Sequence, residues 1–326
     1  MNTLIQIVIL AVGFLCLIKG ADIFVNGSSA LAKRFNVSGL IIGLTIVALG
    51  TSAPEMAVST LAAFQGSSEI ALSNVVGSNI FNLLGVLGVC AVISPLPVDR
   101  GILKRDFPVT IITTALLLLV TCGYAFVDRK IMRYGLMEKV GVVTRPIGAL
   151  SVALFVGYII FLMRESKNDE ADENSEKKIP MWKCVLLLIV GLVLVVAGGQ
   201  AVVNSSKEIA RAAGMTETLI GLTIVAVGTS LPELVTSIVA TRKGETGMAI
   251  GNVLGSNIFN LLFILGFSGI IRPVEINMAS VYDIMILIAI SVISFIFALT
   301  SKKIVRVEGI LMILIYIADV IFAAVR

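Results

Sequence analysis

Ile42-Gly-Leu-Thr-Ile-Val-Ala-Leu-Gly-Thr-Ser-Ala-Pro-Glu55 decides the fold, because the chain repeats it 178 residues later as Ile220-Gly-Leu-Thr-Ile-Val-Ala-Val-Gly-Thr-Ser-Leu-Pro-Glu233. Only two of the fourteen positions differ. The same offset aligns Asn74-Val-Val-Gly-Ser-Asn-Ile-Phe-Asn-Leu-Leu84 with Asn252-Val-Leu-Gly-Ser-Asn-Ile-Phe-Asn-Leu-Leu262. Apolar helices resemble one another by chance, but polar strings do not. The chain therefore consists of two related halves.

The composition is typical of an integral membrane protein. Of the 326 residues, 57% are hydrophobic and 14% are charged, and the mean hydropathy is +1.03, which is far more apolar than a soluble domain. Runs of roughly 20 apolar residues, long enough to cross ~30 Å of hydrocarbon, recur along the chain. We predict an all-α fold of ten spanning helices at 3–34, 38–64, 69–93, 105–126, 146–163, 181–212, 216–241, 247–271, 280–299 and 304–324.

The repeat and the loops predict the domain organisation. Residues 1–163 form a first five-helix repeat with its motif at 43–88, and residues 181–326 form a second with its motif at 221–266. Residues 164–180 form a charged linker. Five spans is an odd number, so the second repeat enters the membrane from the opposite face and the repeats are inverted, as in many secondary transporters.

The distribution of basic residues predicts the orientation, because cytoplasmic loops carry the excess of Lys and Arg. That excess falls inside when the N-terminus lies outside. We therefore expect extracellular termini and a cytoplasmic linker. We also expect a location in the plasma membrane and a protein that works as a monomer in the lipid bilayer.

The repeated stretch interrupts its own helix. Pro54 lies in the middle of a span, where proline lacks a backbone donor and leaves carbonyls without helical partners. In lipid, such a break is tolerated only where protein, water or a bound ion satisfies the released groups. Gly228-Thr-Ser-Leu-Pro-Glu233 repeats the break in the other half. The sequence therefore predicts two broken helices whose free carbonyls line a cavity or an ion site.

Each break ends on a glutamate, Glu55 or Glu233, with no lysine or arginine nearby in the sequence. A carboxylate inside the membrane costs roughly 2.5 to 3.5 kcal/mol, and two facing carboxylates repel each other unless a cation neutralises them. Calcium takes about 6 to 8 oxygen ligands of the carboxylate, carbonyl, amide and hydroxyl types. Polar side chains at four-residue spacing supply neutral oxygens on the next helix of each half: Asn74, Ser78 and Asn82, then Asn252, Ser256 and Asn260.

Several other classes of function are disfavoured. The chain has no histidine, which argues against zinc and copper, and it lacks the aspartate dyad or serine–lysine pair of an intramembrane enzyme. No basic face with interleaved aromatic residues indicates nucleic-acid binding, and no cofactor is expected. Proline kinks and Asn or Ser stripes also serve helix packing alone, but their duplication with matching glutamates favours an ion site. Lys19 and Asp22 are spaced to pair within the first helix.

The strings Gly-Thr-Ser-x-Pro-Glu and Gly-Ser-Asn-Ile-Phe-Asn resemble the repeats of the cation/calcium antiporter superfamily, in its sodium/calcium exchanger branch, over nearly the whole chain. The resemblance implies that transported calcium binds the carboxylates of Glu55 and Glu233 and the main-chain oxygens of Thr51 and Thr229. It implies that transported sodium binds the same glutamates together with Ser52, Ser78, Ser230, Ser256 and the carbonyls of Ala48 and Ala226.

Asn82 and Asn260 match the remaining central position of the family site, where some relatives carry an aspartate in the second repeat. Two amides leave only two strong acids in the centre, which balance one calcium ion but not three sodium ions. We interpret the chain as a calcium/sodium antiporter that works by alternating access. Calcium/proton antiport is the alternative, although that branch carries a glutamate at the two asparagine positions. A calcium-permeable channel is the alternative from a different class.

Overall fold

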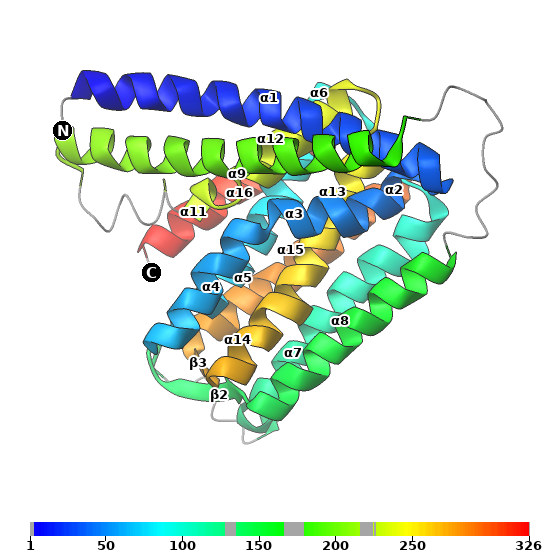
Figure 1. Ribbon diagram of the computed structural model, residues 1–326. Helices are drawn as coiled ribbons and strands as arrows, with labels where there is room; N and C mark the ends of the chain where they lie inside the picture. The colour runs from blue at the N-terminus through cyan, green and yellow to red at the C-terminus, as the bar shows by residue number, and fades with distance from the viewer. Residues whose placement is uncertain (1–2, 128–134, 166–178, 216–223, 225, 326) are drawn as a thin grey trace.

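The computed structural model describes residues 3–127, 135–165, 179–215, 224 and 226–325. The chain folds as a bundle of long helices, with α1 and α9 lying side by side across one face of it (Figure 1). Most of the predicted linker at 164–180 and the start of the predicted helix at 216–241 fall outside the described residues.

The first half contains α1 (Thr3–Phe35), α2 (Gly39–Ile42), the π-helical turn η1 (Gly43–Val47), α3 (Ala48–Thr51), α4 (Ala53–Gln65), α5 (Ser68–Phe81), η2 (Asn82–Val86), α6 (Leu87–Ile93), β1 (Leu96–Pro97), η3 (Ile102–Asp106), α7 (Phe107–Val127), β2 (Lys139–Val143) and α8 (Arg145–Glu165). The second half contains α9 (Met181–Ala212), α11 (Ala226–Gly228), α12 (Leu231–Arg242), α13 (Thr246–Ile258), η7 (Phe259–Ile264), α14 (Leu265–Ile271), β3 (Val274–Asn277), α15 (Met278–Ser301), β4 (Lys303–Ile304) and α16 (Arg306–Val325).

The described helices confirm a multi-pass membrane protein. Within the described residues, seven helices are long and apolar enough to cross a membrane, and the bent pair Gly39–Thr51 and Ala53–Gln65 gives an eighth. Helices lie at the predicted ranges to within a few residues, with α11 and α12 covering the described part of 216–241. The number of ten spans stays a prediction.

The predicted break in the second span is present. Its two parts, Gly39–Thr51 and Ala53–Gln65, meet at 49° with Ser52 between them. Pro54 lies in the first turn of α4, where backbone N–H groups form no bond within the helix, so the N–H that proline lacks is not needed. Pro232 takes the same place in α12, so the two halves are interrupted at equivalent positions.

The segments α5–η2–α6 and α13–η7–α14 form the centre of the bundle. In each of these two spans 78% of the apolar window is buried, against 17–33% for the other full-length spans. The two run antiparallel, since Gly66, two residues before the start of α5, lies against the guanidinium of Arg272, which follows the end of α14. The polar stripes of both halves are therefore inside the protein instead of facing lipid.

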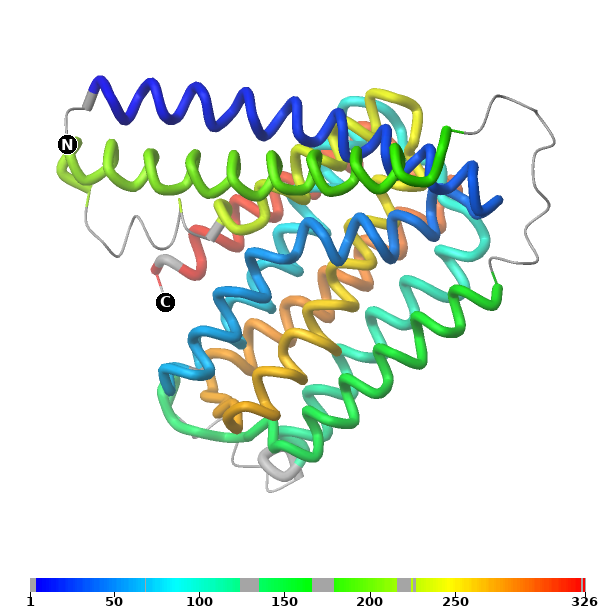
Figure 2. Tube along the Cα trace, viewed as in Figure 1, coloured from blue at the N-terminus to red at the C-terminus, as the bar shows by residue number. Residues whose placement is uncertain are grey.

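α1 and α9 pack against each other antiparallel along their length, and Figure 2 shows their two traces side by side. Glycines permit the close approach of the two backbones. A Cβ on Gly20 would lie 2.7 Å from Leu194 Cβ, and one on Gly191 would lie 2.5 Å from the Phe24 nitrogen. Small residues at such contacts are the usual means of tight helix packing in membranes.

Two short antiparallel sheets join the halves, and these strands correct the purely helical prediction. β1 pairs with β4, with Leu96 opposite Ile304, and β2 pairs with β3, with Val143 opposite Val274. Each sheet therefore takes one strand from each half. Strands of two to five residues between spans are too short to leave a period in the sequence, so pattern reasoning could not find them.

Candidate functional site

The two predicted glutamates meet in the centre of the bundle. Glu55 and Glu233 lie in the first turns of α4 and α12, and each is only 1% exposed. Their carboxylates are close enough to repel each other electrostatically. The N-terminal end of each short helix carries a partial positive charge that favours the carboxylate, but it does not remove the repulsion between them.

Each glutamate is held by a serine of the opposite half. Ser52 Oγ donates to Glu233 Oε1 at 2.7 Å, and Ser230 Oγ donates to Glu55 Oε1 at 2.9 Å. Ser78 adds a weaker contact, with its Oγ 3.5 Å from Glu55 Oε1 and 3.1 Å from Ser230 Oγ. The site is therefore shared, and neither half contains a complete version of it.

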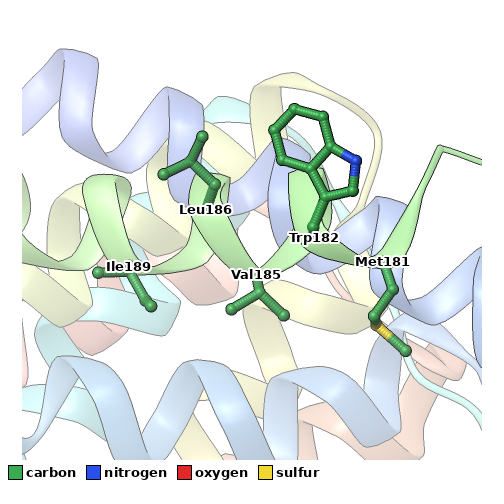
Figure 3. A pocket seen from close by; sticks show the side chains of 5 residues that line it. All are labelled: Met181, Trp182, Val185, Leu186 and Ile189. Carbon is green, nitrogen blue, oxygen red and sulfur yellow. The ribbon is translucent and has the colours of Figure 1, made fainter.

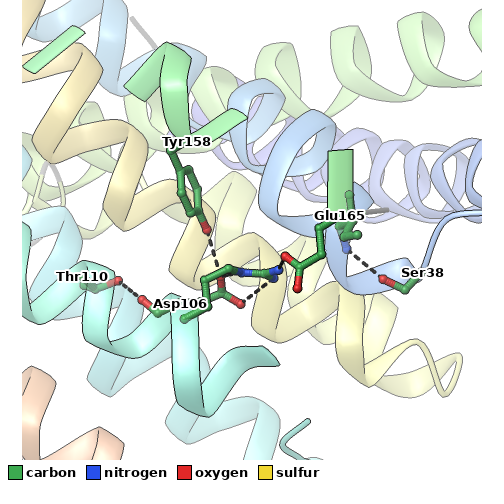
Figure 4. A network of polar contacts seen from close by, with 7 residues as sticks. Ser38, Asp106, Thr110, Tyr158 and Glu165 are labelled. Carbon is green, nitrogen blue, oxygen red and sulfur yellow. Dashed lines mark hydrogen bonds and ion pairs between the residues drawn. The ribbon is translucent and has the colours of Figure 1, made fainter. Parts of the chain in front are cut away.

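Neither glutamate has a cationic partner among the described residues, and a third buried acid shows the contrast. Asp106 is fully buried, but it accepts hydrogen bonds from Arg105 Nε at 2.6 Å and from the Tyr158 hydroxyl at 2.9 Å, and Arg105 also pairs with Glu165 (Figure 4). A buried charge paired in this way is structural. The charges of Glu55 and Glu233 lack such compensation from the protein.

Buried oxygens without partners occur on both carboxylates and on the two central helices. Glu55 Oε2, Glu233 Oε2, Asn82 Oδ1 and Asn260 Oδ1 are all inaccessible and accept no hydrogen bond, and Ser256 Oγ is likewise unpaired. Buried polar atoms are nearly always satisfied by protein, ordered water or a bound ion, and these acceptors are open to such a partner. The donor set of carboxylates, amides and hydroxyls is the one that hard cations prefer. It therefore fits a transported calcium or sodium ion.

The helix breaks add main-chain oxygens to this set. Ser52 N donates to Ala48 O, and Met56 N donates to Ser52 O, both at 3.1 Å. The Thr51 carbonyl between them receives no backbone N–H among these bonds. The predicted carbonyl ligand of Ala48 thus already accepts from Ser52 N and, at 3.4 Å, from Thr51 Oγ1, whereas the Thr51 carbonyl receives neither of the two backbone bonds that flank the break.

Six other predicted ligands lie beside one of the two glutamates, namely Thr51, Ser52, Ser78, Thr229, Ser230 and Ser256. Thr51 and Ser256 lie near the Glu233 carboxylate and Thr229 lies near that of Glu55, although the hydroxyls of Ser256 and Thr229 form no hydrogen bond. Ala226 begins α11, although its side chain is outside the described part. Among the described residues, no three His, Cys, Asp or Glu side chains converge on a point, so the two glutamates carry the charge of the site. The ligand role of each residue stays a prediction.

Two members of the predicted stripes act differently from expectation. Asn74 Nδ2 donates to the Glu55 main-chain oxygen at 3.3 Å, and Asn252 Nδ2 donates to that of Glu233 at 3.4 Å. The oxygen of Asn252 is also occupied, because it accepts from Thr51 Oγ1 at 3.0 Å. These amides hold the backbone of each glutamate, and the Asn252 oxygen is not available to an ion.

The predicted pair of Lys19 and Asp22 is wrong. Asp22 instead pairs with Lys243, whose Nζ lies 2.7 Å from Asp22 Oδ1 and 2.5 Å from Asn26 Oδ1. Lys243 comes directly after α12, so this contact is a tertiary one between the halves. Spacing within one helix could not reveal a partner that lies 221 residues away.

A shallow apolar groove lies on the outer face of α9, away from the glutamates. Its lining consists of Met181, Trp182, Val185, Leu186 and Ile189 (Figure 3). Apart from the indole nitrogen, these side chains offer no polar atom and no oxygen ligand. Such a surface suits lipid chains, and it contributes nothing to ion binding.

Comparison with known proteins identifies the family. The family model described as "Sodium/calcium exchanger protein" matches residues 5–164 and 183–325. The CaxA protein of Alkalimonas amylolytica is 37% identical over 96% of this chain and 97% of its own. The sodium/calcium exchanger MaX1 of Methanosarcina acetivorans is 33% identical over 96% of this chain and 97% of its own. A solved structure of the sodium-calcium exchanger NCX_Mj, soaked with 10 mM Na+ and zero Ca2+, is 30% identical, covers 100% of both chains and has a TM-score of 0.83.

Proposed function

The chain belongs to the sodium/calcium exchanger protein family, and from that premise we propose that it exchanges calcium for sodium across its membrane by alternating access. Family membership makes the protein a membrane antiporter of cations that include calcium. Sodium as the counter-ion is the part of the proposal that needs a test.

One observation carries the proposal. Glu55 and Glu233 are both buried, each is held by a serine of the opposite half, and each keeps one carboxylate oxygen without a partner. Two unpaired charges in a dry interior are expensive, and one divalent cation neutralises both. Two or more sodium ions at overlapping ligands do so as well, so the two kinds of ion compete for the same carboxylates.

We assign the ligands as the sequence predicts. Calcium binds the carboxylates of Glu55 and Glu233 and the main-chain oxygens of Thr51 and Thr229. Sodium uses the same carboxylates together with Ser52, Ser78, Ser230, Ser256 and the carbonyls of Ala48 and Ala226, and Asn82 and Asn260 complete the metal-binding set at the remaining central position. Sharing the carboxylates makes occupancy by calcium and by sodium mutually exclusive, which is the basis of exchange.

Coupling follows from the energy of the empty site. Moving two uncompensated carboxylates through the closed intermediate of the transport cycle costs several kcal/mol per charge, whereas a site neutralised by calcium or by sodium avoids that cost. The protein therefore exposes the site to the other side of the membrane only when an ion occupies it. Calcium carried in one direction thus requires that an ion be carried back in the other. A channel has no such requirement.

Uptake of radioactive calcium into vesicles tests the proposal. Purified protein in liposomes loaded with sodium should take up 45Ca2+, and uptake should stop when internal choline replaces the sodium. Uptake that persists in choline excludes sodium coupling. Uptake that then depends on a pH gradient identifies proton exchange, and uptake that needs no gradient of any counter-ion identifies a channel.

A further inference from the structure

Asn79 and Asn257 are fully buried where the two central helices cross, and neither was identified as a site residue from the sequence. They bind each other reciprocally. Asn79 Nδ2 donates to the main-chain oxygen of Asn257 at 3.2 Å, and Asn257 Nδ2 donates to the main-chain oxygen of Asn79 at 3.3 Å. These two bonds join α5 to α13 at the level of the ion site.

The reciprocal bonds determine which way both amides point. A main-chain carbonyl only accepts hydrogen bonds, so the group of Asn79 that faces Asn257 O must be its NH2. The Asn79 side-chain oxygen therefore lies on the other side, where it accepts from Asn260 Nδ2 at 3.0 Å. By the same reasoning the Asn257 oxygen accepts from Asn82 Nδ2 at 3.1 Å.

The orientation of Asn79 and Asn257 also fixes the orientation of Asn260 and Asn82. Because Asn260 must donate its NH2 to Asn79, its own oxygen has to face away, and the same holds for Asn82 against Asn257. Both of those oxygens, Asn82 Oδ1 and Asn260 Oδ1, are buried and unpaired. A flipped amide would place two carbonyl oxygens against each other and would present an NH2 group to a cation.

We propose that Asn79 and Asn257 are positioning residues that hold the oxygens of Asn260 and Asn82, and not their NH2 groups, toward the transported ion. The inference rests on the proposed function, in which Asn82 and Asn260 are ligands. The support is crosswise: Asn79 of the first half orients a ligand of the second, and Asn257 does the reverse. The amide oxygens are therefore aimed correctly only when the two halves are docked.

A double-mutant cycle tests the proposal on the full-length protein in detergent. The variants are Asn79→Ala, Asn260→Ala and the two combined. The readouts are the 45Ca2+ dissociation constant and the sodium concentration that displaces half of the bound calcium. We expect each single change to weaken at least one of these affinities roughly tenfold, which is a typical loss when a residue that orients a metal ligand is replaced. The double variant should be no weaker than Asn260→Ala alone.

The crossed combination is the matched control. Asn257 acts through Asn82, and its main-chain oxygen still holds Asn79 after substitution, so the losses of Asn257→Ala and Asn260→Ala should multiply. A merely structural residue would give multiplying losses in every combination, and that result for Asn79 with Asn260 would overturn the proposal. If Asn79→Ala does not fold, the mirror cycle of Asn257→Ala and Asn82→Ala decides in its place.

The outcomes separate this inference from the proposed function. If Asn260→Ala weakens binding but Asn79→Ala does not, the positioning role is wrong and the exchanger site stands. If neither Asn260→Ala nor Asn82→Ala changes either affinity, the amides are not ligands, and both the inference and that part of the proposed ligand set fail.

Discussion

α1 and α9 are the equivalent first helices of the two halves, but among the described residues α1 packs along α12, the second part of the opposite broken helix, whereas α9 contacts α3, the end of the first part. Leu17 and Ala21 of α1 lie against the apolar cluster that includes Val235 and Val239 of α12. In the described part of the chain, α9 makes no comparable packing with α4. The position in α4 that corresponds to Val239 is Leu61, which is 56% exposed.

Polar contacts increase the difference between the two sides. Lys243 binds Asp22 and Asn26 of α1, and Ser29 Oγ donates to Glu245 at 2.8 Å. On the other side, Gln65 and Ser67 stand at the positions equivalent to Lys243 and Glu245. The end of α12 is thus covered by α1, while the end of α4 is left uncovered by α9.

A pair of equivalent glutamates therefore lies within an asymmetric enclosure. The serine bonds to the two carboxylates and the asparagine bonds to the two glutamate backbones are matched between the halves, whereas α1 and α9 pack differently against the broken helices. Two inverted repeats can exchange their environments at little cost. The same residues can therefore be reached from one side or from the other.

The largest expected effect comes from the glutamates, which test the symmetric part of the comparison. Glu55→Gln and Glu233→Gln are nearly isosteric, but each removes one of the two charges. At an effective dielectric of 20, a unit charge at contact distance is worth about 4 kcal/mol, or roughly a thousandfold in affinity. 45Ca2+ binding should be lost in either variant, and vesicle uptake should be lost with it.

Glu69→Gln is the control for these variants, because Glu69 is an exposed carboxylate in the first turn of the neighbouring helix α5. It should leave binding and uptake unchanged. Normal calcium uptake by either central variant would disprove the site.

An intermediate effect is expected for the serines, which sharpen the comparison between the halves. Ser52→Ala and Ser230→Ala each remove a hydrogen bond to a buried carboxylate, worth about 1.5–3 kcal/mol. The two variants should lower the melting temperature of the ion-free protein by similar amounts, and calcium should restore most of the loss. A large loss in one variant and none in the other would show that the halves do not share the site equally.

The smallest effect concerns the asymmetric part. Lys243→Ala removes a partly exposed ion pair worth ~0.2–1 kcal/mol, which shifts the balance between the two accessible sides by at most about fivefold. In a variant without native cysteines, a reporter cysteine at position 239 should react faster with a maleimide after this change, and one at position 61 should react more slowly. The charge swap Asp22→Lys with Lys243→Asp should restore the original rates. Unchanged labelling would show that the contact does not hold α1 against α12.

Local sequence was sufficient for the parts of this protein that depend on the chain alone. Hydropathy predicted the helix ranges, Pro54 and Pro232 predicted the breaks, and duplication predicted that Glu55 and Glu233 are equivalent. These features arise from short-range physics, namely the length of an apolar run, the missing N–H of proline and the cost of a charge in lipid.

Only the tertiary structure decided which groups meet across the halves. Ser52 bonds to Glu233 and not to its neighbour Glu55, Asp22 binds Lys243 and not Lys19, and Asn79 holds Asn260. The partners in these contacts are 181 to 221 positions apart in the sequence. No periodicity encodes such distances, because they result from how two inverted repeats dock. The sequence thus determined which residues carry charge and oxygen, and the packing of the halves determined toward what each of them points.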